Sequence, residues 1–277
     1  MTAQFQHQFT SLAPYYDELM SHVPYSSWVD YVLKLCKRYK HSPKQILDCA
    51  CGTGNVTYEL ASRGFDVVGV DFSQEMIDVA RRKSTFNASI PERSRREQFR
   101  NIFTSTPLSD RVVEFVQSDL CNMELGRQFD TVTCLYDSLN YLSTPQMLQN
   151  AFEQISKHLL PQGLFIFDMN APYAFETDMF TQSDRRPQQK LQYDWVAHYD
   201  KQTRLCQVEM TYSRRGENGE VTHFQETHCE RSYTMNEIES CLQAGGLRLL
   251  ESFDSYRLVP PHARSERWYF VASKLKE

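Results

Sequence analysis

The first 170 residues alternate short apolar runs with amphipathic stretches. The apolar runs predict buried strands at 45–47, 65–70, 112–120, 129–135 and 164–167. The stretches around them carry apolar residues at helical spacing, which predicts helices at 9–20, 26–37, 73–83 and from Thr144 to the stop at Pro161-Gln162-Gly163. Strands that alternate with helices indicate a parallel sheet covered by helices.

The pattern changes at about Pro172, where every second residue becomes apolar or β-branched. Three such runs, separated by turn-like sequences, predict antiparallel strands at 191–199, 203–213 and 220–233. Thr234 and Glu237 then form a capping-box sequence for a helix that ends at Gly245-Gly246. Two final strands, at 247–256 and 268–273, complete the prediction: a seven-stranded α/β sheet with an antiparallel sheet inserted over 172–233.

Composition sets broad limits on the class of protein. The 277 residues are 41% hydrophobic and 23% charged, which is typical of a soluble globular protein, and we expect a single domain over 1–277. The net charge of −5 argues against wholesale nucleic-acid binding. No apolar run reaches the ~20 residues of a membrane span, and the N-terminus lacks a secretion signal. Eight scattered cysteines without a C-x-x-C pair read as reduced, buried thiols, so we expect a cytoplasmic protein.

The turn after the first predicted strand carries the clearest functional signal. Residues 46–54 read Ile-Leu-Asp-Cys-Ala-Cys-Gly-Thr-Gly, and Asp71 ends the next strand, 17 positions after Gly54. Glycines at 52 and 54 allow a sharp turn and close approach of a ligand. Asp71 at a strand's carboxyl end can accept hydrogen bonds from two ribose hydroxyls. The pattern predicts a β-α-β unit that binds a nucleoside-bearing ligand.

Two details decide which nucleoside ligand is expected. The third glycine of a dinucleotide fingerprint is missing, since the run continues Asn55-Val56-Thr57. An acid, Asp48, lies four residues before Gly52. Its charge would repel a pyrophosphate but suits the amino group of a methionine moiety.

The string Asp48-x-x-x-Gly52-x-Gly54, with Gly69-Val70-Asp71-Phe72-Ser73 and Met76, resembles class I S-adenosylmethionine (SAM) methyltransferases. Two further segments, 136–142 and 224–233, resemble the YqeM-like bacterial subgroup of small-molecule and uncharacterised methyltransferases. The resemblance covers nearly the whole chain. It implies a Rossmann-like seven-stranded fold, N-terminal helices at 1–40 that cover the SAM site, SAM as methyl donor and S-adenosylhomocysteine as product. Nothing in the sequence demands a metal, and we expect none.

The resemblance and the strand ends together give the candidate cofactor residues. In the resembled family, the acid after the third strand lies near the adenine amino group, and the next residue packs on the ring. The candidates are Tyr16, Trp28, Asp48, Ala50, Gly52, Gly54, Asp71, Phe72, Met76, Asp119, Leu120, Leu135 and Asn140. For Tyr16 and Trp28 the alternative is ordinary packing between helices.

Candidate catalytic residues are His228, Tyr136 and Asp137. His228 is a candidate base because its unperturbed pKa lies near neutrality, and a structural histidine is the alternative. Tyr136 and Asp137 follow the fourth strand and could touch the acceptor or the methionine end of SAM. In the run 224–231, even-numbered and odd-numbered residues occupy opposite faces, and either face could line the crevice. Arg231 could bind a carboxylate of the acceptor, but we expect it to pair with Glu226 or Glu230.

The segment 81–111 departs from the resembled family. It holds eight Lys/Arg and three Asp/Glu, and we interpret 84–111 as a basic surface insertion. The insertion is either a solvated loop or a docking surface for an anionic partner such as RNA.

The sequence therefore predicts a SAM-dependent methyltransferase that acts by in-line displacement on an N or O atom of a small polar metabolite. The signatures of cytosine C5 and exocyclic-amine enzymes are missing after the fourth strand. Three alternatives stay open: an RNA or protein methyltransferase that docks through 81–111, a non-catalytic SAM-binding module, and an NAD-type oxidoreductase. The acceptor and the oligomeric state are not predicted.

Overall fold

The computed structural model describes residues 8–89 and 112–275. Its main sheet has seven strands in the order β10-β11-β5-β4-β1-β2-β3. The strands are β1 (Gln45–Cys49), β2 (Asp66–Asp71), β3 (Val113–Gln117), β4 (Phe129–Cys134), β5 (Leu159–Asn170), β10 (Leu247–Asp254) and β11 (Arg267–Lys274). All neighbours pair in parallel except β11, which is antiparallel to both β5 and β10. The predicted seven-stranded α/β sheet is confirmed.

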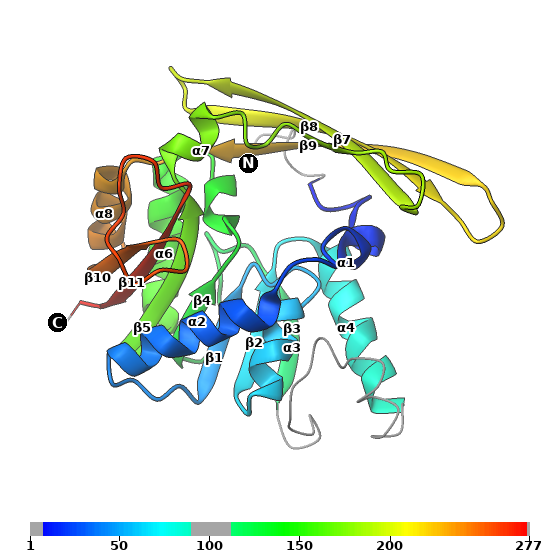
Figure 1. The fold of residues 1–277 in the computed structure, drawn as a ribbon. Helices are drawn as coiled ribbons and strands as arrows, with labels where there is room; N and C mark the ends of the chain where they lie inside the picture. Colours follow the sequence, from blue (N-terminus) through cyan, green and yellow to red (C-terminus); the bar gives the residue numbers. More distant parts are fainter. Residues whose placement is uncertain (1–7, 90–111, 276–277) are drawn as a thin grey trace.

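Helices cover both faces of this sheet (Figure 1). Alternating side chains of β1 divide the core: Ile46 packs with α2 (Tyr25–Arg38) and α3 (Asn55–Ser62), and Leu47 packs on the side of α6 (Pro145–His158) and α8 (Met235–Ala244). Strand order reverses at β1, because β2 and β3 lie on one side of it and β4 and β5 on the other. In such sheets ligands bind at this point, outside the carboxyl ends of the strands.

A second sheet follows β5, with the order β6-β7-β8-β9 and antiparallel pairing throughout. After the short α7 (Pro172–Glu176), its strands are β6 (Gln182–Asp184), β7 (Leu191–Asp200), β8 (Leu205–Arg215) and β9 (Val221–Arg231). This sheet lies across the top of the main sheet in Figure 1, with α1 (Tyr16–Leu19) beneath it. The predicted antiparallel insertion is confirmed, and its short polar strand β6 was missed.

Three element boundaries differ from the predictions for local reasons. The helix expected at 9–20 is a 3₁₀ turn, η2 (Ala13–Tyr15), followed by α1, since Pro14 interrupts it. The stop at 161–163 lies inside β5, because the chain passes from α6 into the strand at Leu159. Helix α4 (Gln74–Ser89) is longer than expected and overlaps the predicted insertion at 84–111, whose remaining residues lie outside the described ranges.

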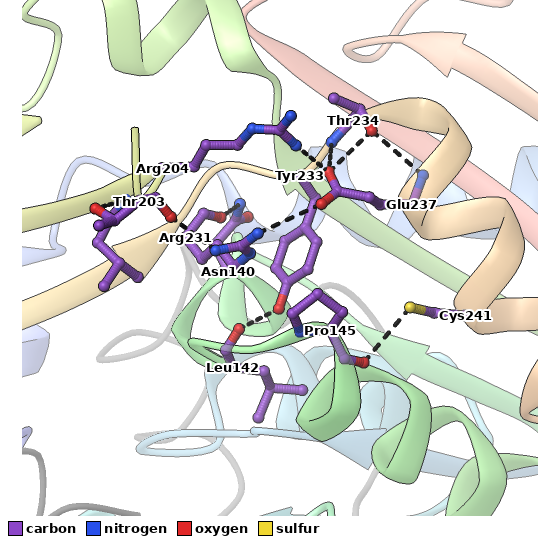
Figure 2. Close-up of polar contacts among 11 residues, drawn as sticks. Asn140, Leu142, Pro145, Thr203, Arg204, Arg231, Tyr233, Thr234, Glu237 and Cys241 are labelled. Atoms are coloured by element: carbon purple, nitrogen blue, oxygen red, sulfur yellow. Dashed lines mark hydrogen bonds and ion pairs between the residues drawn. The ribbon is translucent and has the colours of Figure 1, made fainter. Parts of the chain in front are cut away.

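The two sheets are joined at the end of β9 (Figure 2). The Tyr233 hydroxyl donates to the Leu142 carbonyl. The predicted pairing of Arg231 with Glu226 or Glu230 is wrong: its guanidinium contacts Glu237 of α8 at 3.4 Å and the Thr203 carbonyl at 2.8 Å. The reason is strand alternation, which turns Arg231 away from the even-numbered face of β9.

In the described part of the chain, no helix has the length and apolar character needed to cross a membrane. All eight cysteines are buried and free, as the sequence indicated.

Candidate active site

A cavity of about 340 Å³ lies between the carboxyl ends of the main sheet and the antiparallel sheet. Its floor comes from the ends of β1, β2 and β4, and its roof comes from β8 and β9. The N-terminal segment, including Phe9, Leu12 and Tyr16, lines one side. The cavity therefore occupies the place at the strand-order reversal where a ligand is expected.

The turn after β1 forms part of the floor, and its two glycines have different roles. Gly52 has a φ of +56°, and a Cβ there would meet no atom within 4 Å, so its missing side chain keeps the floor open. Gly54 has a φ of +82°, but a Cβ there would stand 2.7 Å from the Phe115 ring. Gly54 thus serves packing and does not line the cavity, whereas Ala50 and Gly52 do. The sequence had suggested close ligand approach at both glycines.

Asp48 presents a buried carboxylate to the cavity. Its side chain is 2% exposed and accepts hydrogen bonds from the hydroxyls of Thr57 at 2.6 Å and Thr133 at 3.0 Å. Burial raises the pKa of Asp48 to about 6. Among the described residues no cationic side chain pairs with it, so the carboxylate is available to a ligand that carries a positive charge.

Asp71 holds the turn in place while it faces the cavity. Its two carboxylate oxygens accept the backbone amides of Gly52 at 2.7 Å and Ser73 at 2.9 Å. Burial raises the pKa of Asp71. A carboxylate has about four acceptor sites, so Asp71 can still accept a hydrogen bond from a ligand. Ser73 caps α4, because its hydroxyl accepts a hydrogen bond from the Met76 amide at 3.2 Å.

A largely apolar wall adjoins these acids. Phe72, Met76, Leu120 and Leu135 all line the cavity, together with the carboxylate of Asp119. The Asp119 carboxylate also accepts a hydrogen bond from the Cys121 amide at 2.9 Å. This combination of apolar surface and one acceptor is suited to a flat ring with a donor at its edge.

Both N-terminal candidates, Tyr16 and Trp28, line the cavity. The Trp28 ring lies 5.0 Å from the Tyr136 ring. Burial raises the pKa of Tyr16 well above its ordinary value. Both side chains can therefore contact a ligand and pack between helices at the same time.

Asp17, in α1, fastens the N-terminal segment to the glycine turn. It accepts hydrogen bonds from Thr53 at 2.6 Å and Asn55 at 2.9 Å, and pairs with Lys83 of α4 at 2.9 Å. This contact keeps α1 over the cavity.

Asn140 is a candidate that the structure places outside the cavity lining. It is fully buried, donates to the Arg231 carbonyl at 2.8 Å and accepts the Asn170 amide at 2.9 Å (Figure 2 draws the first contact). Its role is to tie β9 to β5, because an amide side chain can satisfy backbone groups of both strands.

The chain after β4 is strained and held by a buried ionic cluster. Tyr136 and Asp137 have φ values of +67° and +53°, which non-glycine residues rarely adopt. Asp168 accepts the amides of Tyr136 at 2.6 Å and Asp137 at 3.2 Å, and it pairs with Arg267, which also contacts Asp137 at 2.7 Å. The cluster fixes both candidate residues at the cavity, and strain of this kind gathers at functional sites.

His228 lies in the roof, and the even-numbered face of β9 is the inward one. Its Nε2 lies 2.8 Å from Glu226 and its Nδ1 lies 3.1 Å from the Tyr141 hydroxyl. Burial opposes the charge of Glu226, but the His228 hydrogen bond and the amides of Phe9 and Leu12 outweigh it and lower the pKa of that carboxyl. Nε2 must carry a proton to donate to this carboxylate. When Nδ1 carries none, it accepts a hydrogen bond from the Tyr141 hydroxyl.

Sequence reasoning missed several cavity residues. They are Tyr141, Glu230 and Arg267 in the lining, with Glu226 and Asp168 as their supports. Asp168 had a usable signal, as an acid at the end of a buried strand. Arg267 enters only through the antiparallel pairing of β11 with β5, which sets it opposite Asn170. In residues 8–89 and 112–275, no group of three or more His, Cys, Asp or Glu is arranged to hold a metal ion.

Comparisons with known proteins agree with this arrangement. A family model described as a methyltransferase domain matches residues 47–167. Two candidate methyltransferases are each 30% identical over 271 residues: GWCH70_2453 of Geobacillus sp. (96% of this chain, 99% of that protein) and YqeM of Bacillus subtilis (97% and 98%). A dTDP-3-amino-3,6-dideoxy-alpha-D-glucopyranose N,N-dimethyltransferase of Streptomyces fradiae is 26% identical over 75% of this chain and 72% of its own.

Solved structures of methyltransferases also resemble this chain. A SAM-dependent methyltransferase from Clostridium acetobutylicum has a TM-score of 0.77 and 27% identity, covering 97% of this chain and 99% of that one. The sugar N-methyltransferase KedS8 from Streptoalloteichus sp. shares the fold, with a TM-score of 0.66 and 22% identity over 92% and 88% of the chains. These relatives are methyltransferases, which excludes the alternative of an NAD-type oxidoreductase. The chain belongs to the SAM-dependent methyltransferase family.

Proposed function

We propose that this methyltransferase modifies an N or O atom of a small polar metabolite in the cavity between its two sheets. The observation that carries the proposal is the roof: β8, β9 and the N-terminal segment cover the carboxyl ends of the main strands. The cofactor and the acceptor must therefore share a cavity that this roof covers, which favours a small molecule over a folded macromolecule. In this proposal, 1–40 and 172–233 form the cover of the site.

The residues present fit SAM. The open space at Gly52 accommodates a ligand next to the backbone, and the uncompensated Asp48 carboxylate suits an ammonium group. We assign Asp48 to the methionine amino group, Asp71 to the ribose hydroxyls and Asp119 to the adenine amino group. The apolar wall of Phe72, Met76, Leu120 and Leu135 would hold the ring, with Tyr16 and Trp28 closing over it.

When bound, SAM supplies a methyl group attached to a positively charged sulfur. That sulfur is the leaving group and becomes a neutral thioether. The protein's contribution is then mainly alignment and exclusion of water, and alignment alone accounts for up to ~7–11 kcal/mol in favourable intramolecular systems. Asp17 and Glu226 hold the N-terminal segment over the site. His228 acts through Tyr141, so we assign His228 a positioning role and place the Tyr141 hydroxyl at the acceptor.

The relative from Streptomyces fradiae supports a small acceptor, because its name assigns it N,N-dimethylation of an amino sugar nucleotide. The RNA or protein alternative depends on 81–111, most of which lies outside the described residues.

Label transfer from tritiated SAM into an extract of the source cells tests the proposal. The extract is separated by size, with nuclease- and protease-treated controls. We expect label in the small-molecule fraction. Label that disappears on nuclease or protease treatment would contradict the proposal and favour docking through 81–111. Binding of S-adenosylhomocysteine without any transfer would favour the non-catalytic module.

A further inference from the structure

Acidic side chains outnumber basic ones in the lining of the cavity. Five acids face it: Asp48, Asp71, Asp119, Asp137 and Glu230. Among the described lining residues, the basic side chains are Arg267 and His228. Since the first three acids are assigned to SAM in the proposed function, Asp137 and Glu230 have no role there.

Asp137 and Glu230 line the cavity from opposite sides. Asp137 follows β4 in the floor, and Glu230 lies in β9 of the roof. Burial raises the pKa of Glu230 well above its ordinary value, and the neighbouring charge of Asp137 adds to this effect. Glu230 is 4% exposed, and one of its oxygens accepts the Asn170 side-chain amide at 3.2 Å.

A third acceptor stands beside this carboxyl pair. Asn170 lines the cavity, and its side-chain oxygen is buried and has no hydrogen-bond partner among the described residues. An unsatisfied buried acceptor is costly unless a ligand supplies the donor. The Arg267 guanidinium donates to Asp137 and Asp168, and among the described residues it makes no hydrogen bond to Glu230 or to the Asn170 oxygen.

We propose that Asp137, Glu230 and the Asn170 side-chain oxygen bind the amino group of the methyl acceptor, which is therefore a primary or secondary amine. The inference rests on the proposed function and narrows it from N or O to N. Three acceptors match the three N–H donors of a primary ammonium group. A carboxylate or phosphate at the same position would meet two acids and be repelled.

The pair also suits the proton movements of amine methylation. The bound ammonium gives one proton to the Glu230 carboxylate and becomes a neutral amine. Its nitrogen lone pair forms the bond to the methyl carbon as the methyl–sulfur bond breaks, and the sulfur keeps that electron pair. The nitrogen carries the positive charge afterwards and loses a second proton to solvent when the product leaves. A buried carboxyl of raised pKa is a stronger base than an ordinary one.

Two cofactor analogues test the inference without knowledge of the acceptor. Sinefungin carries an amino group where SAM carries its methyl-bearing sulfur, whereas S-adenosylhomocysteine has a neutral sulfur there. Calorimetry of the full chain should give sinefungin an affinity about tenfold higher or more, because its ammonium meets the acids. Glu230→Gln should remove most of this preference while leaving the affinity for S-adenosylhomocysteine unchanged, which also shows that the variant folds.

Glu209→Gln is the matched control, since it makes the same change at an exposed position of β8, and it should keep the preference. Equal binding of the two analogues by the wild-type protein, or an undiminished preference in Glu230→Gln, would overturn the inference and leave the proposed function standing. Binding of neither analogue would overturn both.

Discussion

At the scale of single residues, the cavity is defined by carboxylates kept out of water. Asp48 is the clearest, with two hydroxyl donors and a pKa of about 6 that results from burial. In the unliganded protein such a group is largely protonated at pH 5 and ionised above pH 7. A ligand ammonium favours the ionised form, so affinity should rise with pH through this range.

We therefore expect S-adenosylhomocysteine to bind about tenfold more weakly at pH 5 than above pH 7, since one pKa unit corresponds to a factor of ten. Asp48→Asn should bind weakly and lose most of this pH dependence. Calorimetry at several pH values measures both. An affinity of the wild type that stays level between pH 5 and pH 7, or an equal slope in the variant, would rule out the assignment of Asp48.

The two glycines of the turn should respond differently to the same change. Gly52→Ala places a methyl group in the open floor, so we expect a large loss of S-adenosylhomocysteine binding and a stability cost of only ~1–2 kcal/mol from the left-handed backbone. Gly54→Ala adds a collision with Phe115 to the same strain, so its stability cost should be higher by about 1–3 kcal/mol. Urea unfolding and calorimetry separate the effects, and the reverse ranking would refute these roles.

At the scale of elements, the junction between β9 and the N-terminal segment shapes the cavity. Glu226 accepts the backbone amides of Phe9 at 2.9 Å, Thr10 at 3.0 Å and Leu12 at 2.9 Å, besides its contact with His228. A charged acceptor that gathers three amides replaces the pairing that a strand would otherwise supply. One side chain thus fixes a segment that has little secondary structure of its own.

Glu226→Gln should loosen this segment selectively, because an amide brings a donor to a place where all partners donate. We expect faster hydrogen exchange at the amides of Phe9, Thr10 and Leu12, with exchange in β1 and β5 unchanged. Glu220→Gln, at an exposed position before β9, makes the same change as a control. Unaltered protection of the three amides in Glu226→Gln would show that other contacts hold the segment.

The elements themselves were largely predictable from the sequence, because each buries a regular pattern. Strand β1 is a short apolar run buried on both faces, and helix α6 has a clear apolar period. The capping box at Thr234 is formed as expected. Prediction from the sequence failed where the structure of a segment depends on the strands that pair with it. The three polar residues of β6 form a strand only because β7 pairs with them, and the two faces of β9 looked alike until its partners were known.

At the scale of the molecule, the site exists because distant segments meet. Asp137, Glu230 and Arg267 come from a loop, the inserted sheet and the last strand, and no local pattern relates them. The glycine turn, by contrast, is local, and its sequence pattern alone predicts it. Sequence reasoning therefore found the half of the cavity assigned to SAM and missed most of the half assigned to the acceptor.

The joint between the sheets should also be measurable. Tyr233 is fully buried, and its hydroxyl donates to the Leu142 carbonyl across the joint (Figure 2). Tyr233→Phe leaves that carbonyl unsatisfied, and we expect the free energy of unfolding to fall by about 1–3 kcal/mol. Urea denaturation measures the change. A stability within experimental error of the wild type would indicate that the joint relies on its other contacts.

A crystal structure of the protein with sinefungin tests the central claim most directly, namely that the cofactor lies on the floor with its reacting end toward the carboxyl pair. The account predicts the nucleoside against Asp71 and Asp119, the methionine amino group at Asp48, and the additional amino group within hydrogen-bonding distance of Asp137 and Glu230. A ligand bound in the opposite orientation, or outside the cavity, would contradict it.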